Sequence, residues 1–185
     1  MNRLLPIASR EDIPTEYRET PIGLLLEYHN LGRDLEPYTN AELLIGMCMD
    51  NRKHLHIPDN FAFIIRTGGA NLRYSEFKVS YAISVGGVRS IALIGHTQCG
   101  MVNLIARKEQ FVQGLVSAAG WQSGAAEEHF FHFAPIFEIV NEVDFVLSEV
   151  KRLRLRYPKI AVAPLLYRVE DNRLYLIQEG PNAEG

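Results

Sequence analysis

Two short polar segments constrain this chain most, because each follows directly on an apolar run that is typical of a buried strand. Residues 48–52 (Cys-Met-Asp-Asn-Arg) follow the run at 42–47, and residues 96–100 (His-Thr-Gln-Cys-Gly) follow the run at 88–95. Such runs, separated by a helical pattern, predict parallel strands of a βαβ arrangement. Because the carboxyl ends of parallel strands share one edge of a sheet, we expect the two segments to lie close together there.

The remaining apolar runs complete an α/β pattern with a mostly parallel central sheet. Runs at 61–66, 160–169 and 173–178 predict three further strands. Three residues join the last two strands, which is too short for a crossover and predicts an antiparallel pair. We therefore expect about four parallel strands plus an antiparallel fifth, flanked by helices. The pattern predicts helices over residues 22–32, 75–85, 100–111 and 135–157.

Two stretches fall outside this pattern. Residues 1–20 contain Pro6 and Pro14, which interrupt a helix and predict an extended arm. Residues 112–128 are rich in glycine, alanine and polar side chains, and we interpret them as a surface excursion. The length of 185 residues predicts a single domain over residues 1–185, with residues 1–32 forming an N-terminal arm and helix.

Composition and charge exclude several classes of partner. The chain has 19 Lys and Arg against 22 Asp and Glu, a formal net charge of −3. Nucleic-acid and membrane-surface binding need a basic patch, which this balance does not provide. No apolar h-region is found near the start, and no run approaches the roughly 18–20 apolar residues of a membrane span. We therefore expect a cytoplasmic protein.

Both cysteines lie in the two polar segments, together with a histidine. Cys48, His96 and Cys99 would supply three protein ligands to Zn²⁺ and leave a fourth position for water, as catalytic zinc sites do. Two buried structural thiols, or a redox pair, are the alternatives, although the chain has no Cys-x-x-Cys to favour redox chemistry. Spacing alone leaves these alternatives open.

Asp50 and Arg52 are candidates for a second role at the same edge. Residues two apart on an extended segment can face the same way, so the two side chains could pair beside the metal. An ion-paired Asp50 stays ionised and can orient a water molecule by accepting its hydrogen bond. Alternatively, Asp50 could become the fourth metal ligand and close the site, or the two residues could form an ordinary surface ion pair.

Histidines elsewhere in the chain have weaker claims to function. His54 and His56 alternate in a predicted loop, and His129 and His132 are three apart on a predicted helical face beside several phenylalanines. Either pair could bind a metal or relay protons, but histidines in such settings are more often solvated or packed against aromatic rings. We expect His29 on a helix surface.

The motifs resemble the β-class carbonic anhydrases in content and in order. The matching residues are Cys48-x-Asp50-x-Arg52, then 65–69 (Ile-Arg-Thr-Gly-Gly), then 95–101 (Gly-His-Thr-Gln-Cys-Gly-Met), and they look most like the archaeal-type branch. The resemblance implies zinc bound by Cys48, His96 and Cys99, with an Asp50–Arg52 dyad governing the fourth position and Asp50 a ligand only in a closed form. It implies reversible hydration of carbon dioxide to bicarbonate by zinc-bound hydroxide.

The resemblance also implies a homodimer or higher homo-oligomer, with the N-terminal helix lying across a partner subunit. Departures from the family pattern concern the pocket: Thr67-Gly68 replaces Asn-Ala, Gln98 stands where the branch usually has Asp, and the segment 111–133 is long. Two alternatives therefore remain. One is a carbonyl sulfide or carbon disulfide hydrolase on the same site, and the other is a non-catalytic homologue that binds zinc or bicarbonate.

Overall fold

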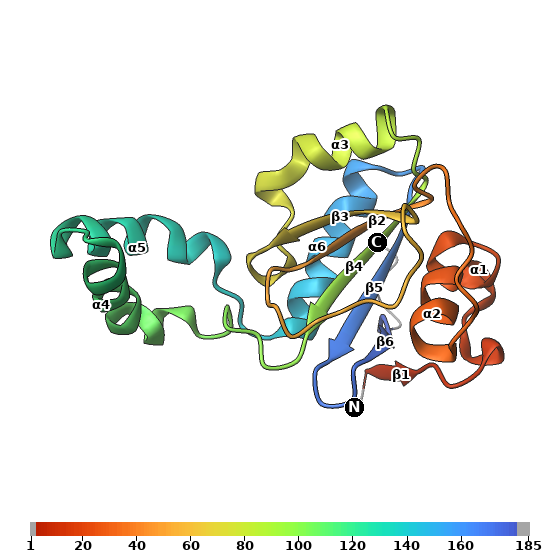
Figure 1. The fold of residues 1–185 in the computed structure, drawn as a ribbon, viewed down its shortest axis with the longest axis horizontal. Coiled ribbons are helices and arrows are strands. Elements are labelled where there is room, and N and C mark those ends of the chain that lie inside the picture. The colour runs from red at the N-terminus through yellow and green to blue at the C-terminus, as the bar shows by residue number, and fades with distance from the viewer. Residues whose placement is uncertain (1–2, 181–185) are drawn as a thin grey trace.

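A computed structural model describes residues 3–180 of the chain (Figure 1). The predicted single domain and its arm include residues 1–2 and 181–185, which lie outside the described part. The strands are β1 (Leu4–Pro6), β2 (Leu43–Cys48), β3 (Ala62–Thr67), β4 (Ser90–His96), β5 (Ala161–Arg168) and β6 (Arg173–Ile177). The α-helices are α1 (Thr15–Arg18), α2 (Pro21–Leu31), α3 (Glu76–Ser84), α4 (Lys108–Ala119), α5 (Ser123–Phe137) and α6 (Glu142–Arg156). Short 3₁₀ helices are η1 (Arg10–Asp12), η2 (Gly68–Ala70), η3 (Arg73–Ser75) and η4 (Leu104–Arg107).

The strands form one mixed sheet in the order β1-β6-β5-β4-β2-β3. β3, β2, β4 and β5 are parallel, and β6 runs antiparallel to β5. This arrangement confirms the predicted parallel sheet with an antiparallel fifth strand. The sequence did not predict β1, which pairs antiparallel with β6 and makes the start of the arm the sixth strand of the sheet.

Helices cover both faces of the sheet, and β2 is fully buried between them (Figure 1). Ile45 packs with α2 in the core on one face, whereas its neighbour Leu44 packs with α3 and α6 in the core on the other face. A parallel strand buried on both faces is expected to be apolar at successive positions, which is why β2 and β4 stand out in the sequence.

None of the helices within residues 3–180 has the length and apolar character to cross a membrane.

The segment after β4 corrects two predictions. Residues 100–111 do not form one helix, because Asn103 has a left-handed φ of 52° and η4 precedes α4. Residues 112–128 are not an irregular excursion but the end of α4 and the start of α5, a helical hairpin that projects from the sheet (Figure 1). Alanine is a strong helix former, and Gly120, with a φ of 71°, ends α4 in the left-handed conformation that glycine favours.

The predicted helix over residues 135–157 is also wrong, because two helices share its apolar pattern. α5 ends at Phe137, and α6 begins only after Asn141, whose side chain accepts the Asp144 N–H at 2.8 Å as an N-cap. Between them Ile139 forms a bridge with Val102 and is buried beside the two cysteines. Periodicity alone cannot separate a buried linker residue from the next turn of a helix.

Gly95 lets α6 approach β4 closely. A Cβ atom at this position would lie 2.7 Å from Val146 Cγ2. We expect Gly95→Ala to lower the free energy of unfolding by about 1–3 kcal/mol through overpacking, and Val146→Ala to recover part of this loss. Denaturant unfolding measures both effects. Gly124→Ala on the open face of α5 is the control, because nothing lies within 4 Å of the added methyl group; an equal loss there would contradict the close-packing argument.

Candidate metal centre

The parallel pairing of β2 with β4 brings the two polar segments together. Cys48 is the last residue of β2 and His96 the last residue of β4, and Met47 and Ile94 are paired across the two strands. Cys99 follows on the turn that leaves β4. The carboxyl ends of parallel strands are where open α/β sheets build their sites, and the cluster lies at that edge.

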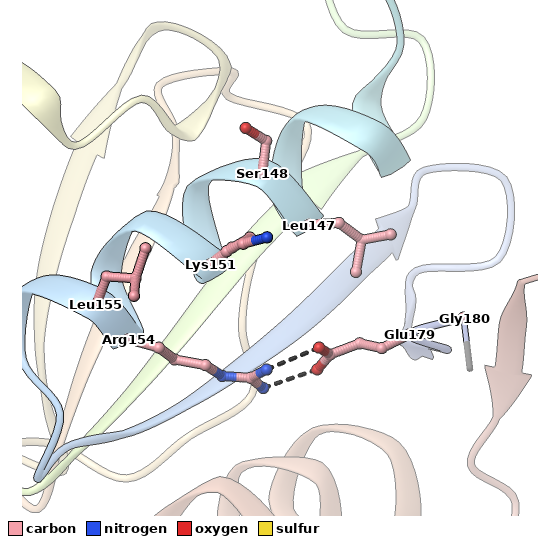
Figure 2. A pocket seen from close by; sticks show the side chains of 7 residues that line it. All are labelled: Leu147, Ser148, Lys151, Arg154, Leu155, Glu179 and Gly180. Carbon is pink, nitrogen blue, oxygen red and sulfur yellow. Dashed lines mark hydrogen bonds and ion pairs between the residues drawn. The ribbon is translucent and has the colours of Figure 1, made fainter. Parts of the chain in front are cut away.

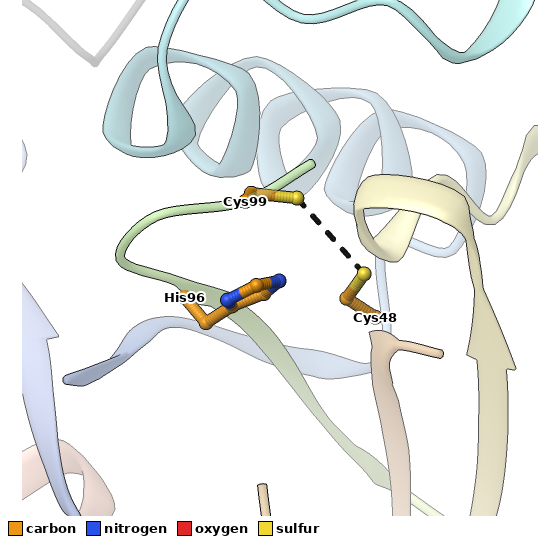
Figure 3. A group of neighbouring side chains, drawn as sticks. All are labelled: Cys48, His96 and Cys99. Atoms are coloured by element: carbon orange, nitrogen blue, oxygen red, sulfur yellow. Dashed lines mark hydrogen bonds between the residues drawn. The ribbon is translucent and has the colours of Figure 1, made fainter. Parts of the chain in front are cut away.

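Cys48, His96 and Cys99 offer ligand atoms that all lie within 4.8 Å of one another. Figure 3 shows the imidazole ring and the two thiols facing a common space. All three residues are buried. Within residues 3–180 this is the one group of three or more His, Cys, Asp or Glu side chains arranged to hold a metal ion.

The geometry fits zinc better than a disulfide. The two sulfur atoms are 4.0 Å apart, far beyond the roughly 2.05 Å of a disulfide bond. Two sulfurs bound tetrahedrally to zinc at about 2.3 Å each would be separated by about 3.8 Å. The predicted convergence of the three residues is therefore present, and the distance between the sulfurs suits a metal held between them.

His96 has the tautomer that a metal ligand needs. Its Nδ1 lies 2.9 Å from the carbonyl oxygen of Thr97, which can only accept, so Nδ1 carries the proton. Nε2 is then left with a lone pair, and it is buried without a hydrogen-bond partner within the described residues. A buried polar atom with no partner is rare and needs an explanation, which a metal ion in the shared space supplies.

The two thiols titrate very differently beside each other. Their mutual hydrogen bond is the main cause: it lowers the pKa of Cys48 and raises that of Cys99, because a second thiolate would stand next to the first. A divalent cation would remove this conflict, since a coordinated thiol is deprotonated outright.

One wall of the cluster is apolar and comes from the turn after β4, the linker between α5 and α6, and the start of α6. Ile139 packs against both cysteines, with Met101 and Phe145 beside it. Glu142, at the start of α6, accepts the backbone N–H of Cys99 at 3.0 Å and so fixes the turn that carries this ligand. Sequence analysis missed Glu142, because its contact spans 43 residues.

Asp50 and Arg52 form the predicted pair directly beside the ligand atoms. Arg52 Nη2 lies 2.8 Å from Asp50 Oδ2, and the Arg52 backbone N–H donates to Oδ1 at 2.9 Å. The hydrogen bonds from the guanidinium hold the pKa of Asp50 well below its usual range, so the carboxylate is ionised. Its Oδ2 is 4.0 Å from His96 Nε2, close enough to reach the same space with a small rotation.

A second set of contacts anchors Arg52. Arg52 Nη2 donates to the carbonyl oxygen of Gln98 at 3.0 Å. Gln98 has a left-handed φ of 57°. Gln98 in turn donates from Nε2 to Glu170 Oε1 at 3.0 Å, and Thr97 Oγ1 donates to Glu170 Oε2 at 2.8 Å. Glu170 lies beyond β5, and its contact with the His96–Cys99 turn is not predicted by any pattern in the sequence.

The other histidines do not join the cluster. His54 and His56 are exposed in the loop before β3, and His129 packs among the rings of Phe111, Trp121 and Phe133. His29 lies on α2, as predicted, and its side chain is half-buried there. Burial lowers its pKa, and its Nδ1 accepts the His56 backbone N–H at 3.0 Å while Nε2 donates to the Asn172 carbonyl.

Cavities also lie outside the cluster. A cavity of about 480 Å³ between α6 and the segment after β6 contains the Arg154–Glu179 ion pair and none of the cluster residues (Figure 2). An apolar cavity of about 420 Å³ lies between the helical hairpin and Met101. Met101 therefore borders both this second cavity and the wall of the cluster.

The fold, but not the sequence, has close counterparts among known proteins. No family model matches the chain, and no curated protein sequence matches it. Among solved structures, β-carbonic anhydrase isoform I of Trichomonas vaginalis has a TM-score of 0.61 at 18% identity, over 80% of this chain and 90% of that one.

Two further structures are similar. The carbonic anhydrase of Glaciozyma antarctica has a TM-score of 0.57 at 22% identity, over 74% of this chain and 83% of that one. The apo form of a carbon disulfide hydrolase has a TM-score of 0.53 at 21% identity, over 77% and 79%.

If the cluster holds zinc, His96→Ala or Cys99→Ser should remove it. Each change deletes one of three ligands, so we expect bound zinc to fall from one per chain to near zero after dialysis. Metal analysis by mass spectrometry measures the ratio. His132→Ala, on α5 and outside the cluster, is the control and should keep its zinc; retention of stoichiometric zinc by Cys99→Ser would contradict the assigned site.

The parallel sheet, the helices on both of its faces and the ligand cluster at the carboxyl ends of the strands are thus found together. The chain has the fold of the β-carbonic anhydrases.

Proposed function

We propose that this protein is a zinc-dependent carbonic anhydrase that interconverts carbon dioxide and bicarbonate. One observation carries the proposal: the Cys48, His96 and Cys99 ligand atoms converge beside an ionised Asp50 on a β-carbonic anhydrase fold. The motifs of residues 48–52 and 95–101 support the archaeal-type branch of that family. Gln98 departs from the branch, but it binds the carboxylate of Glu170, so a carboxylate is still present beside this turn.

Cys48, His96 and Cys99 would hold the zinc. When bound, zinc supplies Lewis acidity that brings the pKa of a coordinated water to about 7. Two thiolates offset the charge of the ion, and the buried apolar wall at Ile139 keeps bulk water out. The low dielectric of such a site strengthens every charge interaction within it.

Asp50 would orient the attacking water. Its ionised carboxylate can only accept hydrogen bonds, so a water molecule between Oδ2 and the ligand atoms must donate to it. That bond directs a lone pair of the water toward the carbon of carbon dioxide. The water oxygen forms the new bond to carbon, one proton leaves to buffer, and bicarbonate is the product. Arg52 holds the carboxylate in this orientation.

Hydrolysis of carbonyl sulfide or carbon disulfide on the same site is the second candidate. It is favoured by the apolar cavity of about 420 Å³ that shares Met101 with the wall of the cluster, since the sulfur atoms of these substrates are larger and more polarisable than the oxygen atoms of carbon dioxide. The similarity to a carbon disulfide hydrolase fits this candidate no better than the first. Initial rates with carbon dioxide, carbonyl sulfide and carbon disulfide, measured on one preparation, separate the two.

A non-catalytic homologue that binds zinc or bicarbonate is the third candidate. It requires Asp50 to occupy the fourth position permanently, with no turnover at any pH. The pairing of Asp50 with Arg52 argues against it, because both carboxylate oxygens are engaged by the guanidinium and the backbone N–H of Arg52.

We propose that the protein is located in the cytoplasm. The two free thiols, Cys48 and Cys99, suit a reducing compartment.

Asp50→Ala should lower the rate of carbon dioxide hydration by about 100- to 10,000-fold, the range typical of a lost acid-base group. Zinc content should stay at one per chain, because Asp50 is not among the three ligands. Stopped-flow hydration with a pH indicator measures the rate. Asp59→Ala, an exposed carboxylate in the next loop, serves as the control; full activity in Asp50→Ala would remove the role given to this residue.

We also propose that the working unit is a homodimer or higher homo-oligomer. β3 is an outer strand of the sheet, and its exposed Phe63 and Ile64 lie next to Phe77 and Tyr81 of α3. Apolar outer strands of this kind pair with other chains unless they are covered. Docking of residues 1–32 on a partner stays a prediction, since β1 and α2 already pack on the sheet of their own chain.

Phe77→Glu should shift the protein toward the monomer. The side chain is 81% exposed, so the change adds a charge to the α3–β3 surface without disturbing the core. Sedimentation velocity at several concentrations measures the shift, and Leu155→Glu on the exposed side of α6 is the matched control. An unchanged distribution in Phe77→Glu, or a monomeric parent protein, would contradict the use of this surface.

A further inference from the structure

Lys53 is a buried cation that none of the motifs includes. Its side chain is fully buried, which is rare for lysine unless the charge is paired. The ammonium group donates to the carbonyl oxygen of Asp50 at 3.0 Å and lies 3.9 Å from Asp50 Oδ1. Within the described residues this is the one hydrogen bond that Nζ makes, so compensation of the buried charge also depends on nearby anionic groups, among them the Asp50 carboxylate.

A second cation fixes the backbone of the same loop. Arg66, on β3, donates from Nη1 to the carbonyl oxygens of Cys48 and Asp50, each at 3.4 Å, and from Nη2 to that of Lys53 at 3.3 Å. The Asp50 carbonyl therefore faces two cationic donors. These contacts hold the loop so that Lys53 cannot easily follow the Asp50 carboxylate if that side chain rotates.

The Asp50 carboxylate lies between two opposing attractions. Arg52 engages both of its oxygens, and Lys53 is near Oδ1. On the other side, Oδ2 is 4.0 Å from His96 Nε2, next to the space in which a metal would be held. A carboxylate that turned to bind the metal would move away from both cations, so each cation opposes that rotation.

We propose that Lys53 is a positioning residue that keeps the Asp50 carboxylate off the metal, so that the fourth position stays open to an external ligand. The inference rests on the metal site of the proposed function and extends it. The Arg52 side chain is 44% exposed, so solvent and salt screen its attraction to Asp50. The Lys53 side chain is fully buried, so salt screens its attraction to Asp50 less than it screens that of Arg52.

Ligand binding to a cobalt-substituted protein tests this role without any turnover. Cobalt(II) replaces zinc in such sites and absorbs visible light, and imidazole is a neutral probe whose binding does not depend directly on the charge of Lys53. In Lys53→Met we expect imidazole to bind at least tenfold more weakly than in the parent, because Asp50 competes for the fourth position. Lys151→Met, an exposed lysine on α6, should bind imidazole like the parent.

A double-mutant cycle separates this role from a general structural effect. In an Asp50→Ala background there is no carboxylate to compete, so Lys53→Met should leave imidazole affinity unchanged. Equal affinity in Lys53→Met and the parent, or the same loss with and without Asp50, would overturn the proposal. If Lys53→Met does not fold, Lys53→Gln keeps a donor for the Asp50 carbonyl without the charge and should weaken imidazole binding in the same direction.

The outcomes also separate this proposal from the proposed activity. A parent protein that binds cobalt and imidazole but hydrates no carbon dioxide contradicts the proposed activity. The double-mutant cycle of Lys53 and Asp50 can still be measured in that case, because it uses imidazole affinity and not turnover. A parent that binds no cobalt contradicts the metal site and, with it, the role of Lys53.

Discussion

The pairing of β2 with β4 holds the sulfur atoms of Cys48 and Cys99 4.0 Å apart, and the rest of the site depends on this close approach of two buried thiols. As thiolates they would repel each other strongly in a buried setting, and the opposite effects on their pKa values express that conflict. A divalent cation between them turns the repulsion into attraction. The free Nε2 lone pair of His96 faces the same space, so one ion accounts for three otherwise unfavourable groups.

Around these ligands, positive and negative groups alternate. Arg52 and Lys53 flank Asp50, Arg66 binds the carbonyl oxygens of the loop, and Glu170 orders the turn on the other strand. Arg52 and Lys53 each contact a backbone carbonyl oxygen as well as the Asp50 carboxylate, whereas Arg66 contacts only backbone and Glu170 only side chains, and together these contacts hold both segments in place before any ligand binds. Such preorganisation is what allows a polar site to favour one orientation of a bound water.

The sequence was sufficient for five of the six strands of the sheet and for the polar residues at its edge. β2 and β4 are buried on both faces, so each is a nearly continuous apolar run, and Cys48, His96 and Cys99 lie at or just after the ends of these runs. Asp50 and Arg52 were predicted as a pair because their contact is local.

Other features depended on contacts that periodicity does not report. The break between α5 and α6 depends on the burial of Ile139 against the cysteines, and β1 depends on an available edge of β6. Glu142 and Glu170 reach the site across 43 and 73 residues. Lys53 looked like one more polar loop residue, and only the packing of the loop against β3 and the cluster buries it.

The central claim is that a zinc ion held by this cluster makes the protein a carbonic anhydrase. The most direct test measures carbon dioxide hydration by the full-length parent protein at graded zinc loading, with zinc content determined on the same samples. The account predicts a rate that rises in proportion to bound zinc and reaches its maximum at one zinc per chain. Full zinc loading with no hydration above buffer, or hydration that is independent of zinc content, would contradict it.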